Sequence, residues 1–204
     1  LQIFLGRETI NTYAQFLQSN QELLWLVRFS LLALVAIHLW SASALTVENR
    51  AARPLGYSGN PAPTAASYAS RTMVMSGVII ATFIVYHLLH YTVQVPAINF
   101  TGHDFRLLHE PLRDGTERHD VFAMMVLGFR NPFVSIFYLV GVGLLCLHLS
   151  HGLRAMFQSL GFKNWQWGPL IDRVSPVMAW VLFLGYASIP LAVLLGLVGK
   201  EVVR

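Results

Sequence analysis

Five of the eight histidines lie inside long apolar stretches of the chain, where an ionisable side chain is costly. They are His38, His87, His90, His148 and His151. Imidazole can ligate a metal, carry a proton or hydrogen-bond a buried ligand. Because ionisable residues inside membrane spans usually have a function, we expect these five side chains to do chemistry.

The composition is that of a membrane protein. The 204 residues are 55% hydrophobic and 12% charged, with a mean hydropathy of +0.55. A bilayer core about 30 Å thick needs roughly 20 apolar residues of helix. Four runs are long enough, over residues 23–47, 71–95, 132–157 and 174–199. We therefore predict an all-α transmembrane bundle of four spans, in a single domain over residues 1–204.

The connections between these runs orient them. Residues 48–71 and 154–173 hold six Lys or Arg and two acidic residues, whereas residues 96–130 hold four Arg and five acidic residues. Positive charge favours the cytoplasmic side, so connection 96–130 and the N-terminus are expected outside. That connection ends in "HDVFAMMVLGF", which predicts an interfacial helix near residues 119–129. Surface exposure is expected for its other histidines, His103, His109 and His119.

Signatures of soluble enzymes are missing from the sequence. It has no phosphate-binding glycine loop, no zinc-ligand spacing and no Ser/His/Asp nucleophile pattern. The single cysteine, Cys146, cannot form an intrachain disulfide and is expected to pack as a small apolar side chain. The net charge of +4 is attributed to membrane orientation rather than to nucleic-acid binding.

The histidines can be assigned depths in the bilayer. His38 and His148 each lie about three residues beyond the midpoint of spans that run in the same direction, so both sit roughly 5 Å toward the cytoplasm. His87 lies on a span of opposite direction, about 10 Å away in an outer layer by the same helical rise. His38 and His148 are therefore predicted to face each other at one depth.

Level histidines on separate helices of a bundle suit a ligated haem iron. A porphyrin also needs a flat space beside its ligand. Gly141 and Gly152 share the helix face of His148, and Ser41 lies one turn after His38. These small residues would leave room for the ring, although close helix packing would also explain them.

Other polar residues in or near the spans could serve the same cofactor. Each of His90 and His151 lies three residues beyond a better ligand, and could bond a haem propionate, line a quinone pocket or carry protons. Arg28 either extends its charge to the interface or pairs with an outer propionate. Arg71 and Arg154, at cytoplasmic span ends, could pair with an inner haem.

Three segments resemble a known family. They are "VYHLLHYT", "GFRNPFVSIFYLVGVGLLCLHLSHGLRAMFQSLG" and "NRAARP" followed by "ASYASRTM". They resemble the cytochrome b membrane-anchor subunit of bacterial succinate dehydrogenase/fumarate reductase, the respiratory complex II, in its single-subunit, two-haem form. The resemblance covers nearly the whole chain. It implies a five-helix anchor in the bacterial cytoplasmic membrane that binds two haems b. Flavoprotein and iron–sulfur subunits would bind on its cytoplasmic face, it would exchange electrons with a quinone, usually menaquinone, and the complex could form a higher oligomer.

Carried over to this chain, the resemblance makes His38 and His148 the axial ligands of the haem nearer the iron–sulfur subunit. It makes His87 one ligand of the outer haem. The family's other outer ligand comes from a helix preceding the first span seen here. Since this sequence starts at Leu1, we expect that helix to be missing from it. A true four-span form with one haem, or a ligand from another chain, is the alternative.

The quinone would be bound by outer-side groups, with His90 and Tyr91 as candidates. The dicarboxylate chemistry would belong to the flavoprotein subunit. One alternative is the cytochrome b anchor of another membrane redox enzyme, of the hydrogenase or formate dehydrogenase type. The other is a transporter or a purely structural anchor whose histidines carry protons, and such a protein would bind no haem.

Overall fold

The structure is a computed structural model that describes residues 1–52 and 72–203. In the described residues there are six α-helices and one small two-stranded sheet, so the predicted all-α class is confirmed. The chain divides into two compact units, one of residues 16–74 and one of residues 1–15 with 75–204. The two units are described separately below.

All four predicted spans are helices long and apolar enough to cross a membrane. They are α2 (Gln21–Ala51), α4 with the turn η2 (Met73–His87 and Leu88–Thr92), α6 (Pro132–Ser159) and α7 (Gly168–Leu194). The helix α6 begins at its predicted residue. Its N-terminus is fixed because Asn131 accepts hydrogen bonds from the backbone N–H groups of Phe133 and Val134, with Pro132 at the first helical position. The chain is thus a multi-pass membrane protein.

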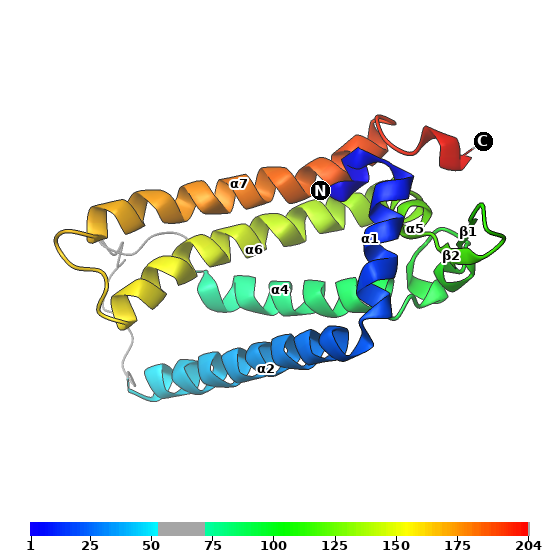
Figure 1. Cartoon of the computed structure of the whole chain (residues 1–204). Helices are drawn as coiled ribbons and strands as arrows, with labels where there is room; N and C mark the ends of the chain where they lie inside the picture. The colour runs from blue at the N-terminus through cyan, green and yellow to red at the C-terminus, as the bar shows by residue number, and fades with distance from the viewer. Residues whose placement is uncertain (53–71, 204) are drawn as a thin grey trace. The chain divides into compact units, whose positions relative to one another are not determined.

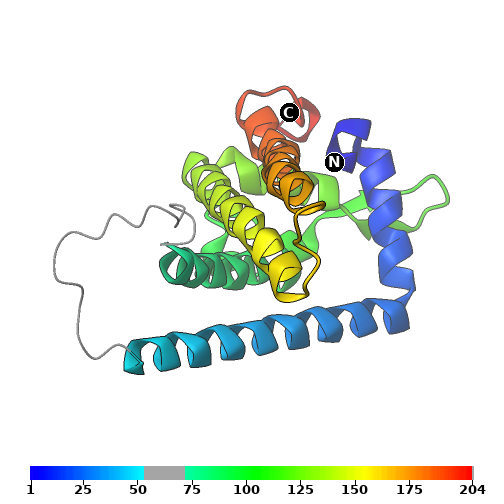
Figure 2. The ribbon, with the colours of Figure 1, turned by 90° about the vertical axis from the view of Figure 1, so that its left-hand side faces the viewer.

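Three of these helices pack together in the larger unit. Figure 1 shows α6 between α4 and α7. The helices α6 and α7 contact each other along their length, and Figure 2 shows the same packing from a second direction. Facing pairs fix the direction of α4: Ser76 lies beside His148, and Tyr86 lies beside Phe137. The residue number increases along α4 from the first pair to the second but decreases along α6, so the two helices are antiparallel.

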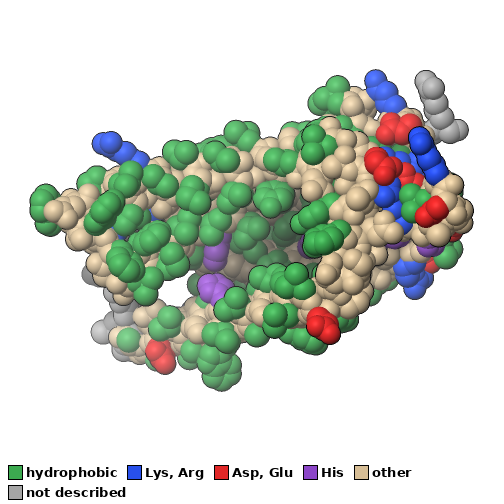
Figure 3. All heavy atoms as spheres, viewed as in Figure 1, with side chains coloured by type: hydrophobic (Ala, Val, Ile, Leu, Met, Phe, Trp, Pro, Cys, Tyr) green, Lys and Arg blue, Asp and Glu red, His purple; other side chains and the backbone are tan. Residues whose placement is uncertain are grey.

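A polar cap closes one end of this unit. It comprises the first part of α1 (Arg7–Ser19), the strands β1 (His109–Pro111) and β2 (Glu117–His119), α5 (Val121–Arg130) and the C-terminal turn η5 (Lys200–Val203). Figure 3 shows acidic and basic side chains gathered at this end, while apolar side chains cover the flanks of the long helices. The N-terminal residues and connection 96–130 therefore share one end, as the charge pattern predicts.

The short helix α5 has ten residues and is too short to span a bilayer, as predicted. It packs into the protein rather than lying with a free apolar face. Six of its residues are buried, namely Phe122, Ala123, Met124, Val126, Gly128 and Phe129. Its N-terminus is capped by Asp120, which accepts a hydrogen bond from the Ala123 N–H at 3.0 Å.

Ion pairs hold α1 against the hairpin β1–β2. The Arg118 side chain, 5% exposed, donates to Glu110 at 2.7 Å and to Glu8 at 3.0 Å. Arg7 pairs with Asp120, and Asn11 donates to both Glu110 and Asp120. We call these six residues, Arg7, Glu8, Asn11, Glu110, Arg118 and Asp120, the cap network. Two arginines pair with three carboxylates in this network, and this pairing is what permits the burial of Arg118 and Asp120.

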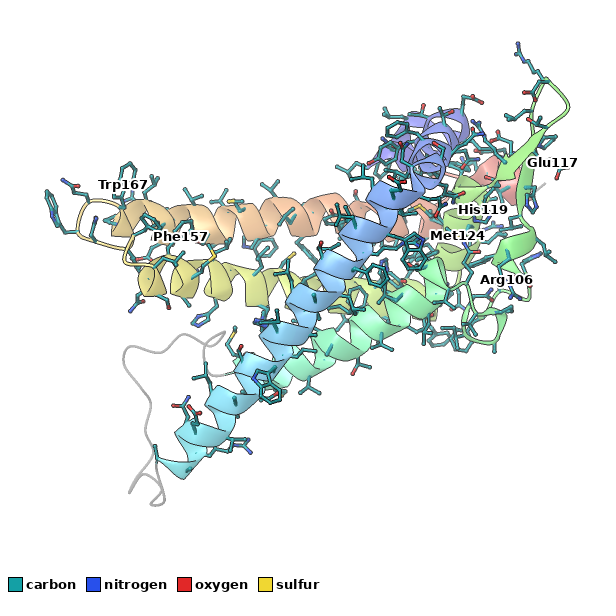
Figure 4. The ribbon with its side chains drawn as sticks, turned by 60° about the horizontal axis from the view of Figure 1, so that its bottom comes forward. Arg106, Glu117, His119, Met124, Phe157 and Trp167 are labelled. Atoms are coloured by element: carbon teal, nitrogen blue, oxygen red, sulfur yellow. The ribbon has the colours of Figure 1, made fainter. Side chains whose placement is uncertain are left out.

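The opposite end of α6 and α7 is aromatic. The loop after α6 exposes Phe162, Trp165 and Trp167. Figure 4 places Phe157 and Trp167 at this end, and His119 and Met124 at the cap. Exposed tryptophans at a span end are typical of a membrane–water interface, so this end agrees with a bilayer that surrounds the long helices between the loop and the cap.

Candidate functional site

The last turn of the second span is a π-turn. Over Leu88–Thr92 the hydrogen bonding widens, so that the Val93 N–H donates to the Leu88 carbonyl five residues back, at 2.8 Å. Such turns occur often at functional sites. This one places His87, His90 and Tyr91 beside Tyr138 of α6, so three side chains that could do chemistry lie in one small region.

A single hydroxyl lies between two of the histidines. The Tyr138 Oη on α6 is 3.1 Å from the His90 Nδ1 and 3.4 Å from the His87 Nδ1. The Tyr138 ring is 6% exposed and packs edge-on against Phe83 and Phe129, at centroid distances of 5.3 and 5.0 Å. Aromatic packing thus fixes the position of the hydroxyl.

The two histidines differ in access. His90 is completely buried, with its ring beside Tyr86, Tyr91 and Phe105. His87 is exposed on the side of α4. Only His87 is therefore placed to bind a large planar group without rearrangement.

Two buried polar atoms in this region have no hydrogen-bond partner among the described residues, the His90 Nε2 and the Tyr91 Oη. Both side chains face Gly128 on α5. A Cβ at Gly128 would lie 2.5 Å from the Tyr91 Oη and 3.3 Å from the His90 Cε1. The absence of a side chain at this position is what allows α5 to approach the π-turn.

The inner histidine of α6 also faces a hydroxyl. The Ser76 Oγ on α4 is 3.5 Å from the His148 Nδ1, and a Cβ at Gly77 would lie 3.7 Å from the His148 Cε1. Ten residues separate Tyr138 from His148 on α6, a rise of about 15 Å. His87 and His148 are therefore in different layers, as predicted, and more widely spaced along the helices than the predicted 10 Å or so.

The two glycines expected to leave a porphyrin slot differ. At Gly141 the Phe83 ring of α4 occupies the place that a Cβ would take, so this glycine serves close helix packing. At Gly152 nothing lies within 4 Å of the Cβ position. Of the two, only Gly152 offers open space near His148. Cys146 is buried on the same helix, as expected of a small apolar side chain.

The predicted propionate partners have other contacts in the described residues. Arg28 lies over the Trp25 ring at 5.1 Å, on its own helix α2. Arg154 donates to the Ser150 hydroxyl one turn earlier, at 3.2 Å. Arg71 lies outside the described residues. His151 is half-buried on α6, one turn after His148.

His38 and Ser41 lie on α2, in the smaller unit. They are three residues apart and so share one face of that helix. The pairing of His38 with His148 concerns two units that are described separately, and it stays a prediction.

Surface exposure is confirmed for His103 and His109 but was wrong for His119, which is half-buried. The His119 Nδ1 lies 3.0 Å from the Leu108 carbonyl, to which it donates. The His119 Nε2 then accepts from the Gln94 amide at 3.1 Å, and the same amide contacts the Met124 sulfur. Burial lowers the pKa of His119 below its ordinary 6.5, so the side chain is a neutral structural element of the cap.

The described histidines can be compared with what a metal ion and a haem each need. No cluster of three or more His, Cys, Asp or Glu that could hold a metal ion occurs among residues 1–52 and 72–203. A bis-histidine haem needs only one imidazole from each of two helices. His148 and His87 each have the Nδ1 beside a hydroxyl, so either ring would hold a haem iron through its Nε2.

Tyr138 and Ser76 were not singled out from the sequence. A usable signal was present, because Tyr138 is ten residues before His148 and Ser76 is eleven before His87. On antiparallel helices, nearly equal spacings bring each hydroxyl level with the histidine of the other helix. Comparison with protein families, with curated proteins and with solved structures finds no match to this chain.

Proposed function

We propose that this chain is the haem b membrane anchor of a succinate:quinone oxidoreductase, relaying electrons between an iron–sulfur subunit and membrane menaquinone or another quinone. One observation carries the proposal. Two histidines on antiparallel spans, His87 and His148, lie in separate layers about 15 Å apart along the helices, each with its Nδ1 beside a hydroxyl. A stack of two one-electron carriers needs this arrangement of ligands.

The roles of the residues follow from their positions. When bound, haem b supplies a reversible one-electron carrier whose potential is set by its ligands and surroundings. His148, with His38 from α2, would hold the inner haem beside the open face of Gly152. His87 would hold the outer haem, with its second ligand from elsewhere. The apolar spans keep water away from both positions.

A quinone would be bound near the π-turn. Its two carbonyl oxygens need hydrogen-bond donors, and the buried Tyr91 Oη and His90 Nε2 lack partners among the described residues. Phe105 and Gly128 cover these atoms, so a quinone would reach them only after the loop with Phe105 moves aside. Tyr91→Phe is expected to slow quinone reduction by the intact complex and to leave its haem content unchanged.

Purification of the complex, followed by reduction of its haem with succinate, tests this proposal. The tagged chain, purified from membranes in mild detergent, is expected to bring down a flavoprotein and an iron–sulfur subunit. Succinate should then reduce its haem, and His148→Ala should abolish that reduction. Recovery of a hydrogenase or formate dehydrogenase subunit instead, with no reduction by succinate, would contradict the proposal and favour another membrane redox enzyme.

A further inference from the structure

Tyr138 has a position that ligand spacing alone does not explain. Its hydroxyl lies within hydrogen-bonding distance of both a candidate axial ligand, His87, and the fully buried His90. Histidines that bind metals nearly always donate their second ring N–H to an oxygen, which fixes the ring and raises its basicity. Tyr138 supplies such an oxygen from a helix other than that of the ligand.

We propose that Tyr138 positions His87 and sets the potential of the outer haem, through a hydrogen-bond chain that ends at His90. This inference rests on the proposed haem function. With iron on the Nε2 of His87, the Nδ1 carries the proton and donates to the Tyr138 Oη. The Tyr138 O–H, its oxygen now accepting, donates to the His90 Nδ1. The proton of His90 then resides on its Nε2.

The chain has a definite polarity, and each link strengthens the others. A hydroxyl that donates is a better acceptor, so His90 increases the pull of Tyr138 on the His87 proton. A more basic ligand stabilises ferric over ferrous iron and lowers the potential of the haem. In this polarity the chain ends at the buried His90 Nε2, which has no hydrogen-bond partner among the described residues.

The surroundings keep this chain in place. Phe83 and Phe129 hold the Tyr138 ring edge-on, and the π-turn brings His87 and His90 to the same oxygen. The inner layer has a simpler version of the contact, in which the Ser76 hydroxyl faces the His148 Nδ1 at 3.5 Å. A hydroxyl behind each candidate ligand indicates a shared feature of the two layers.

Potentiometric titration of the purified complex tests the inference. Tyr138→Phe keeps the ring and removes only the hydroxyl. It is expected to raise the midpoint potential of the haem that is lost on His87→Ala by at most about 59 mV, which is a tenfold change in the ferric to ferrous ratio. The other haem should keep its potential. His90→Phe should shift the same haem in the same direction by less.

Tyr86→Phe is the matched control. The Tyr86 hydroxyl lies in the same aromatic region but donates to the Ile98 carbonyl at 3.2 Å, so its removal should change neither potential. Unchanged potentials in Tyr138→Phe, or equal shifts of both haems, would overturn the inference and leave the haem function intact. So would a single haem that is indifferent to His87→Ala. A wild-type complex without haem would overturn both.

Discussion

At the residue scale, the histidines of one span have different surroundings that their spacing does not reveal. His87 and His90 are three residues apart, yet one is exposed on the flank of α4 and the other is completely buried. A regular helix would have placed them on one face. The π-turn that begins at Leu88 alters the path of the chain, and no local sequence rule predicts such a turn.

Gly141 tests the packing of α4 on α6. Gly141→Ala places a methyl group where the Phe83 ring lies, and we expect a loss of roughly 1–3 kcal/mol in the free energy of unfolding. Unfolding in mixed detergent micelles, followed by circular dichroism, measures it. In the control Gly143→Ala, the new methyl group would contact Phe183 at an ordinary 3.5 Å, so stability should not fall. Equal stability of the two variants would contradict the packing described.

At the element scale, the cap is held by ions rather than by apolar packing alone. Arg118→Met removes the guanidinium between Glu110 and Glu8, leaving the mostly buried Glu110 with fewer partners. We expect a loss of about 3 kcal/mol and faster hydrogen exchange in α1. Arg106→Met, which breaks an exposed pair with Asp104, is the control and should leave exchange in α1 unchanged. Similar exchange in both variants would show that the cap does not depend on the network.

The cap should also respond to acid in two steps. Burial lowers the pKa of His119, so the unfolded chain binds its proton first, and this contribution to stability is complete above pH 6.5 and declines below it. Burial raises the pKa of Asp120, but hydrogen bonds from Arg7, the Ala123 N–H and Asn11 lower it by more, so its pKa is below the ordinary value. Its contribution is therefore complete above pH 3.8 and lost in stronger acid. Hydrogen exchange in the cap measured against pH should show both steps, and His119→Gln should remove only the first.

At the scale of the whole molecule, the sequence predicted most of the fold. Apolar runs located all four spans, because hydropathy alone selects a membrane helix. It did not predict α1 or the small hairpin, since their stability comes from the cap network, whose partners lie about a hundred residues apart. It predicted that histidines lie inside the spans α4 and α6, but not the hydroxyls beside them, which depend on the register of the two helices.

The orientation of the chain in the membrane is a further prediction at this scale. The charge pattern places the cap outside and the loop between α6 and α7 in the cytoplasm. In a Cys146→Ala background, a cysteine replacing Arg113 should react with an impermeant maleimide added to intact cells. A cysteine replacing the exposed Trp165 should react only after the membrane is opened. The reverse pattern would contradict the orientation.

The number of haems b bound per chain tests the central claim most directly. Pyridine haemochrome quantitation of the purified complex, against the mass of this chain, is expected to give haem b that decreases on His148→Ala and on His38→Ala. A second haem is expected if another helix or chain of the complex supplies the second ligand of the outer haem. This haem should be lost on His87→Ala. A complex without haem, or with haem that is indifferent to His148, would contradict the claim and leave the histidines to proton transfer or structure.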